Sequence, residues 1–161
     1  LRIRAEHSIS WRRAAILKAY YLRCPHSDVP EEVLQVSLNP DATHVPYLLG
    51  RIFSILETIQ EAANPGINTT IKDRYFNSAA ATPAIIFPTL IALAQKHLKK
   101  LTGDRPGLAI SLNRQLTALL SLLPITTFPA RMSLPEQGAF QLGYYHQTQA
   151  RYQKKEEPEH V

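Results

Sequence analysis

Apolar residues recur along most of the chain at intervals of three and four positions, which is the spacing of one face of an α-helix. The clearest stripe lies within residues 46–63, and its members are Leu48, Ile52, Ile55, Leu56 and Ile59. Four further stretches have the same period, at residues 11–22, 83–101, 104–123 and 133–155. No stretch alternates polar and apolar residues as a half-buried strand does. The pattern predicts an all-α, single-domain bundle of about five main helices.

Residues that cap or break helices mark several predicted ends. Ser10 is a candidate N-cap for the first helix, and Asn64-Pro65-Gly66 ends the second. Ser133 followed by Glu136 is the signature of a capping box at the start of the last helix. Pro88 either kinks the helix over 83–101 or marks where its regular part begins.

Two connections between the predicted helices are less regular. Residues 25–46 contain four prolines, so we expect a loop-rich excursion with one short helix near residues 28–32. Residues 67–82 end in a run of small residues, and we expect one or two short helical turns there.

The length of 161 residues suits one domain, and we place the bundle at residues 1–155 with an acidic C-terminal tail at 156–161. The longest uncharged stretch, residues 75–95, contains two prolines and several polar residues, so we expect no membrane span. The N-terminus is charged and has no apolar core of a signal peptide. A single cysteine excludes an internal disulfide framework and fits a reducing cytosol, so we expect a cytoplasmic protein.

The net charge of +5 conceals an uneven distribution. Residues 1–23 carry +5, residues 24–61 carry −5, residues 62–155 carry +8, and the tail carries −3. Without its tail the chain is therefore more basic than its average indicates, and the long segment 62–155 has almost no acidic compensation. Such a surface favours phosphate neutralisation through backbone contacts rather than base readout.

The basic residues form clusters on the predicted helices. Lys96, Lys99 and Lys100 lie at i, i+3 and i+4, on the face opposite the core stripe of their helix. The other clusters are Arg12, Arg13 and Lys18, then Lys72 and Arg74 beside Tyr75, and finally Arg151, Lys154 and Lys155. For the clusters at 96–100 and 151–155, the alternative is that the cations merely complement the dipole at a helix C-terminus.

Signals for enzyme chemistry are weak, and we expect no catalytic residue, no metal and no cofactor. The chain has no GxSxG, P-loop, GxGxxG or HExxH motif, and its six histidines do not pair at metal-ligand spacing. Cys24 and His26 are the only basis for an enzymatic alternative, because a thiol and an imidazole lie close together there. Tyr144, Tyr145 and His146 are a further candidate group: we expect one tyrosine to pack and the other to reach a partner, and stacking on a base is possible.

Eight short strings of the sequence occur together in the order of a known family. They are YLLGR (47–51), ETIQEAANPGIN (57–68), IKDRYF (71–76), ATPA (81–84), FP (87–88), FPA (128–130), LPEQG (134–138) and GYYHQ (143–147). Together they resemble the C-terminal region of the Csd-type large subunit of type I-C CRISPR Cascade. The resemblance runs from about Trp11 to Lys155, which is nearly the whole chain.

The resemblance implies a function that composition does not. In that family the C-terminal part of the large-subunit gene is also translated separately from an internal start, and the product is the small subunit of the complex. The first residue, Leu1, fits such a start at a non-AUG codon. Small subunits of this kind are helical bundles that line the belly of the crRNA-guided complex, stabilise the R-loop, contact the displaced non-target DNA strand, and are not nucleases.

The implied partners are the backbone subunits, the large subunit, further copies of the chain, crRNA and target DNA. Within the matching strings, we expect Arg51, Lys72 and Arg74 to face nucleic acid or a neighbouring subunit. Tyr75, Tyr144, Tyr145 and His146 are the expected partner contacts. A second hypothesis is a structural spacer held by protein–protein contacts, in which the acidic segment 24–61 docks onto basic subunits and the chain binds no nucleic acid.

Overall fold

The computed structural model describes the backbone of residues 2–23 and 29–156, and the side chains of residues 12–23 and 29–153. These residues form six α-helices and one short 3-10 helix, and no strand occurs among them. In chain order the elements are α1 (Arg2–Arg23), η1 (Glu31–Val33), α2 (Val45–Ala63), α3 (Ile71–Ala81), α4 (Pro83–Asp104), α5 (Pro106–Ser121) and α6 (Leu134–Glu156). The predicted all-α fold is confirmed, with one more helix than the five expected.

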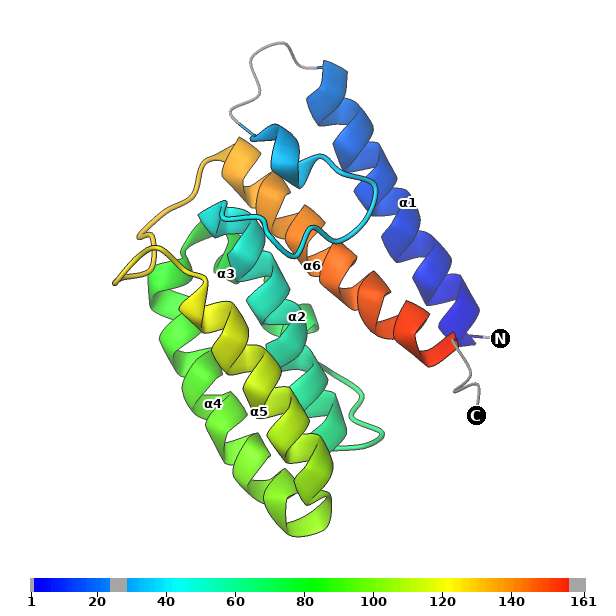
Figure 1. Ribbon diagram of the computed structural model, residues 1–161, viewed down its shortest axis with the longest axis vertical. Helices are drawn as coiled ribbons and strands as arrows, with labels where there is room; N and C mark the ends of the chain where they lie inside the picture. The colour runs from blue at the N-terminus through cyan, green and yellow to red at the C-terminus, as the bar shows by residue number, and fades with distance from the viewer. Residues whose placement is uncertain (1, 24–28, 157–161) are drawn as a thin grey trace.

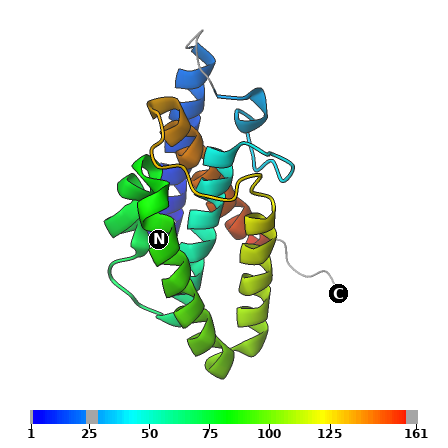
Figure 2. The same cartoon turned by 90° about the vertical axis from the view of Figure 1, so that its left-hand side faces the viewer.

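Helix α2 is the centre of the bundle (Figure 1). The antiparallel pair α1 and α6 lies on one side of it, and the antiparallel hairpin of α4 and α5 lies on the other. Figure 2 shows α3 and α5 on opposite sides of α2. Because α2 has neighbours on nearly every side, its residues from Pro46 to Glu57 are all buried.

Two glycines allow α2 and α6 to approach closely. A Cβ at Gly50 would overlap the backbone carbonyl of Phe140, and a Cβ at Gly143 would overlap the backbone carbonyl of Tyr47. Each helix therefore presents a glycine to the backbone of the other, and no larger residue fits at either position. Around this contact the rings of Phe53, Phe76 and Phe140 meet edge to face, at centroid separations of 5.4–5.8 Å.

Several helix ends match the sequence prediction. The capping box at the start of α6 is confirmed, because the Ser133 backbone N–H donates to the Glu136 carboxylate at 2.6 Å and the Glu136 N–H donates to the Ser133 hydroxyl at 3.4 Å. Helix α2 ends at Ala63, directly before the predicted stop at residues 64–66. The expected short helix near residues 28–32 is the 3-10 turn Glu31–Val33.

Three helices differ from the prediction. Helix α1 begins at Arg2, so Ser10 lies inside the helix and is not its N-cap. Helix α3 is longer than the one or two turns expected, because Thr70 and Asp73 form a capping box that starts it. Helix α4 continues through Pro88, which lies in its second turn, and reaches Asp104.

The proline-rich connection between α5 and α6 is tied to the junction of α3 and α4. The Ala84 N–H donates to the carbonyl of Pro129, and the Met132 N–H donates to the carbonyl of Ala81, both at 3.0 Å. The ring of Phe128 stacks on Phe87 at a centroid separation of 5.3 Å. These contacts fix the direction in which the chain enters α6.

We expect the substitution Gly50→Ala to destabilise the fold by about 2–3 kcal/mol, because the added Cβ can be accommodated only by separating α2 from α6. The matched control is Gly103→Ala within α4, where a Cβ would meet open space. Alanine has the higher helix propensity, so the control should leave stability unchanged or raise it. Thermal and urea unfolding followed by circular dichroism would measure both variants, and equal midpoints for the two would contradict the close contact of α2 and α6.

Candidate nucleic-acid interface

The cations that the sequence predicts as nucleic-acid ligands divide among three regions of the fold. Two regions are accessible, one on α1 and α3 and the other on the C-terminal half of α4. The third is the contact between α2 and α6, where the charged side chains are covered. In Figure 1 the end of α4 lies at the bottom of the molecule, away from the upper part of α1. The predicted residues therefore do not form one continuous surface.

Helix α4 presents the predicted lysine row to solvent. Lys96, Lys99 and Lys100 are all exposed, while Leu98 and Leu101 on the opposite face are buried. The last turn of α4 contains no basic residue, since the helix continues to Asp104. Because the dipole effect falls off within the last turn, it does not account for these lysines.

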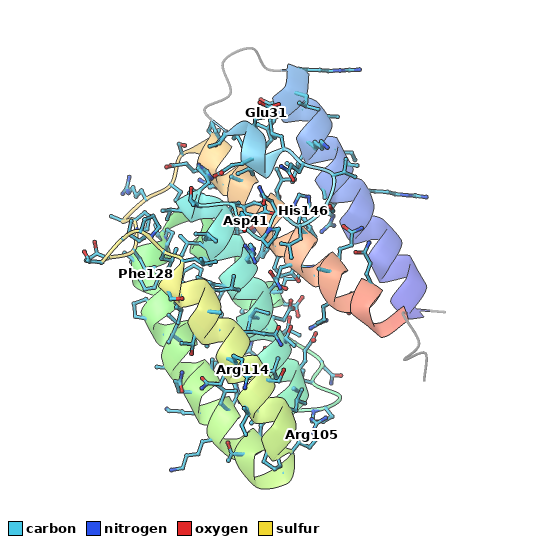
Figure 3. The ribbon with its side chains drawn as sticks, viewed as in Figure 1. Glu31, Asp41, Arg105, Arg114, Phe128 and His146 are labelled. Carbon is cyan, nitrogen blue, oxygen red and sulfur yellow. The ribbon has the colours of Figure 1, made fainter. Side chains whose placement is uncertain are left out.

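Neighbouring residues extend the positive charge at this end of the bundle. The Lys100 ammonium donates to the side-chain carbonyl of Asn64 at 3.0 Å, which orients it over the end of α2. Arg105 lies at the turn between α4 and α5, and Arg114 lies on α5 (Figure 3). The Arg105 guanidinium also donates to the carbonyl of Ala62, so this turn is held against the end of α2.

The second accessible region lies where α1 and α3 meet α6. Arg12, Arg13 and Arg74 are exposed, and Lys72 is half-buried. The Lys72 ammonium lies 5.0 Å from the centroid of the Tyr144 ring and 5.6 Å from that of Tyr145, within the range of cation–π attraction.

Arg13 on α1 supplies a second cation that contacts Tyr145. Its guanidinium donates to the Tyr145 hydroxyl at 3.4 Å. A cleft of about 470 Å³ opens between the three helices. Its lining residues are Arg13, Ile16, Leu17, Lys72, Asp73, Phe76, Asn77, Gln141 and Tyr145.

Arg51 and Arg151 occupy the contact between α2 and α6. Arg51 is only 6% exposed. Its guanidinium donates to the Gln147 side chain at 3.0 Å and to the carbonyls of Asn39 and Pro40 at 3.3 Å. Arg51 is thus buried in the fold and not on the accessible surface, where it was expected to face nucleic acid or a neighbouring subunit: the residue fastens the 34–44 loop and α6 to α2.

Arg151 is half-buried and bound internally. It forms an ion pair with Glu61 at 3.3 Å, which is the one ion pair among the residues whose side chains the structure describes. It also donates to the hydroxyl of Thr58 at 2.5 Å. Arg151 therefore links α6 to α2, and its charge is largely compensated before any partner binds.

The aromatic candidates are mostly part of the core. Tyr144, Tyr145 and His146 are between 2% and 4% exposed, so both tyrosines pack in the fold, whereas one of them was expected to reach outwards to a partner. Adjacent helical residues point to different faces, but here α2, α3 and α1 cover the successive faces of α6. Tyr75 on α3 is half-buried and packs against the core.

The His146 imidazole is held neutral by its surroundings. Burial and the nearby Lys18 lower the pKa of His146 to about 4. Its Nδ1 forms a hydrogen bond of 2.8 Å with the hydroxyl of Tyr47, in which the donor depends on the tautomer of the neutral ring. His146 is labelled in Figure 3, where it lies on α6.

Sequence reasoning missed the structural role of Glu57. This carboxylate is 7% exposed and accepts hydrogen bonds from the hydroxyls of Tyr144 at 2.5 Å and Thr70 at 2.7 Å. Burial raises the pKa of Glu57, and the two hydrogen bonds oppose that shift. The sequence did contain a signal for this structural role. Arg51 and Glu57 are the only charged residues between positions 45 and 59, in the most apolar predicted helix.

The described residues contain no group of histidine, cysteine and carboxylate side chains that could hold a metal ion. Cys24 and His26, the basis of the enzymatic alternative, lie outside the described residues. None of the helices in the described part of the chain is long and apolar enough to cross a membrane.

Comparison with known proteins identifies one family. A family model described as CRISPR-associated protein (Cas_Csd1) matches residues 1–152 of the chain. This match confirms the resemblance that the short strings indicated. No curated protein matches the chain.

We expect His146→Gln to change how stability depends on pH. The folded protein binds a proton at His146 with a pKa of about 4, against 6.5 for an unperturbed imidazole, so the unfolded chain is protonated first as pH falls. The stability of the native protein therefore decreases between these two values, whereas glutamine keeps an acceptor for Tyr47 and does not titrate. From about pH 7.5 to about pH 4, the stability advantage of the native protein over the variant should shrink by about 3 kcal/mol.

Urea unfolding of both proteins across this range would measure the difference. Glu57, whose raised pKa acts in the opposite direction, is common to both proteins and cancels in the comparison. A difference that stays constant with pH would contradict a neutral His146 in the fold.

Proposed function

Because the chain belongs to the Cas_Csd1 family of CRISPR-associated proteins, we propose that it is a non-enzymatic small subunit of a type I-C Cascade complex. In this role it lines the belly of the crRNA-guided complex and contacts the displaced non-target DNA strand. The family match carries the proposal, since membership implies a place in a CRISPR effector complex. The other partners are the backbone subunits, the large subunit, further copies of the chain and crRNA, and the compartment is the cytoplasm.

The exposed cations support contact with nucleic acid. The lysines of α4, Arg12 and Arg13 of α1, and Lys72 and Arg74 of α3 have no carboxylate partner among the described residues, because the one ion pair found there is that of Arg151 and Glu61. Cations that are not already paired can neutralise phosphates and release counterions. In related guided effectors, pairing with the guide reads the sequence, and protein contacts to the backbone tip a near-balanced exchange of strands.

The burial of acidic residues favours this proposal over the structural spacer. The acidic segment 24–61 contains six carboxylates, but Glu57 is buried and Glu61 is paired with Arg151. Glu32 accepts hydrogen bonds from the backbone N–H groups of residues 43 and 44. Glu31 and Asp41 are the exposed carboxylates of the described part of this segment, so little of its charge is available for docking.

Replacing Lys96, Lys99 and Lys100 together by alanine should weaken target-DNA binding by the assembled complex. If each lysine neutralises one phosphate of a single strand, the slope of log K against log salt should become less negative by about 2. The matched control is the triple arginine variant at the same positions, which keeps the charge and should bind like the native protein. R-loop formation by the alanine variant that equals the native level at low salt would exclude this cluster from the interface.

A second experiment separates the proposal from the spacer. Glu31→Lys combined with Asp41→Lys reverses the exposed acidic charge of η1 and the following loop. We expect the variant to co-purify with the other subunits, and we expect DNA binding to be retained. Loss of co-purification, with DNA binding intact in any residual complex, would favour the spacer instead.

A further inference from the structure

We propose that the cleft between α1, α3 and α6 binds one phosphodiester group of a single nucleic-acid strand, with Arg13 and Lys72 as its cationic ligands. The inference rests on the proposed function and specifies where on the chain a strand is held. It concerns a different region from the lysine row of α4, so the two can fail independently.

The position of Lys72 is fixed by a rigid support. The ring below its ammonium group belongs to Tyr144, which is 2% exposed. The Tyr144 hydroxyl donates to the buried Glu57 at 2.5 Å, and Glu57 in turn accepts from Thr70 in the turn before α3. Because this ring cannot move without breaking the core, the ammonium group is held at the cleft before a ligand arrives. Such preorganisation lowers the entropic cost of binding.

A second cation comes from a different helix and contacts the same support. Arg13 on α1 donates to the Tyr145 hydroxyl, while Lys72 on α3 lies over the face of the Tyr145 ring. Two positive charges from separate elements are thus brought to one buried tyrosine. The guanidinium has five N–H donors, and the bond to Tyr145 uses one of them.

The balance of charge in the cleft is positive. Asp73 also lines it, but the Asp73 carboxylate accepts the backbone N–H of Thr70 at 2.8 Å and is occupied as part of the capping box. Neither Asp73, which caps α3, nor the buried Glu57 beneath Tyr144 forms an ion pair with Arg13 or Lys72, so both cations remain available to an anion.

The remaining lining fits a nucleotide backbone. Asn77 and Gln141 contribute side-chain amides that can donate to phosphate oxygens, and Ile16 and Phe76 contribute apolar surface for a sugar. A volume of about 470 Å³ is sufficient for a single nucleotide unit. The tyrosines therefore take part in a way that differs from base stacking: they form the buried support on which the cations are held.

The test uses the 161-residue chain and a fluorescein-labelled oligothymidylate, with binding measured by fluorescence anisotropy over a range of salt concentrations. The cleft variant is Arg13→Gln with Lys72→Gln. The matched control is Arg23→Gln with Arg131→Gln, which removes the same charge from exposed positions outside the cleft. We expect the cleft variant alone to lose at least about fivefold in affinity at low salt, and its salt slope to become less negative by about 0.7, the change for one phosphate of a single strand.

Two further measurements in the same assay test the role of the Tyr145 hydroxyl and the chemical nature of the ligand. Tyr145→Phe removes the hydroxyl that orients Arg13, so it should weaken binding in the native background and have no further effect when Arg13→Gln is present. An oligonucleotide with an uncharged methylphosphonate backbone should bind the cleft variant and the control equally. A gain in affinity from a 5′-phosphate that depends on Lys72 would overturn the assignment in favour of a terminal phosphomonoester.

The outcomes separate this inference from the proposed function. Equal affinity of the cleft variant and the control, together with weaker binding by the α4 triple alanine variant, would overturn the cleft and leave the proposed function standing. Absence of oligonucleotide binding by the native chain would overturn the cleft assignment, and loss of R-loop formation on changing the α4 lysines would then still support the proposed function.

Discussion

The close contact of α2 with α6 is the constraint on which the rest of the structure depends. Gly50 and Gly143 each meet the backbone of the opposite helix, and this fixes both the separation and the register of the pair. In that register, polar side chains pair across the contact from one end to the other. The pairs are Tyr47 with His146, Arg51 with Gln147, Ser54 with Thr148, Glu57 with Tyr144, and Thr58 with Arg151. A shift of either helix would leave several of these buried groups without partners, and unpaired buried polar groups are costly. The register is therefore determined as much by these pairs as by apolar packing.

This contact also determines which charges remain on the surface. It takes Arg51 and Glu57 into the interior and pairs Arg151 with Glu61, so two cations and two carboxylates are removed from any interface. The carboxylates lost come from the acidic segment 24–61, which then contributes little negative charge to the outside. The cations of α1, α3 and α4 are not compensated in this way. Because the two signs are removed in equal number, packing leaves the net charge of +5 unchanged but concentrates it on fewer accessible groups.

The sequence was sufficient for features that depend on one helix alone. The apolar stripe of α2, the capping box of Ser133 and Glu136, and the outward direction of Lys96, Lys99 and Lys100 all follow from local spacing. It was not sufficient where several helices cover one another. Periodicity does not reveal that α2 is enclosed on nearly every side, so Arg51 was expected on the surface. For the same reason Tyr145 was expected as a candidate partner contact, although three helices enclose it. The cleft at Arg13 and Lys72 could not be predicted from the sequence. Its two cations are 59 positions apart and are brought together only by a tyrosine of a third helix.

The buried Glu57 connects the interior of the bundle to that cleft. Its carboxylate holds the hydroxyl of Tyr144, and the ring of Tyr144 lies beneath the ammonium group of Lys72. Lys72 itself opposes the raised pKa of Glu57, since a nearby cation favours the ionised carboxylate. The attraction acts in both directions: an ionised Glu57 stabilises the cation above the ring, and the cation stabilises the carboxylate below it. A tyrosine that separates the two charges prevents them from closing into a direct ion pair, which would neutralise the lysine. The arrangement thus retains a positive charge at the surface while stabilising it from within, and this explains how the same residues can belong to the core and support a binding surface.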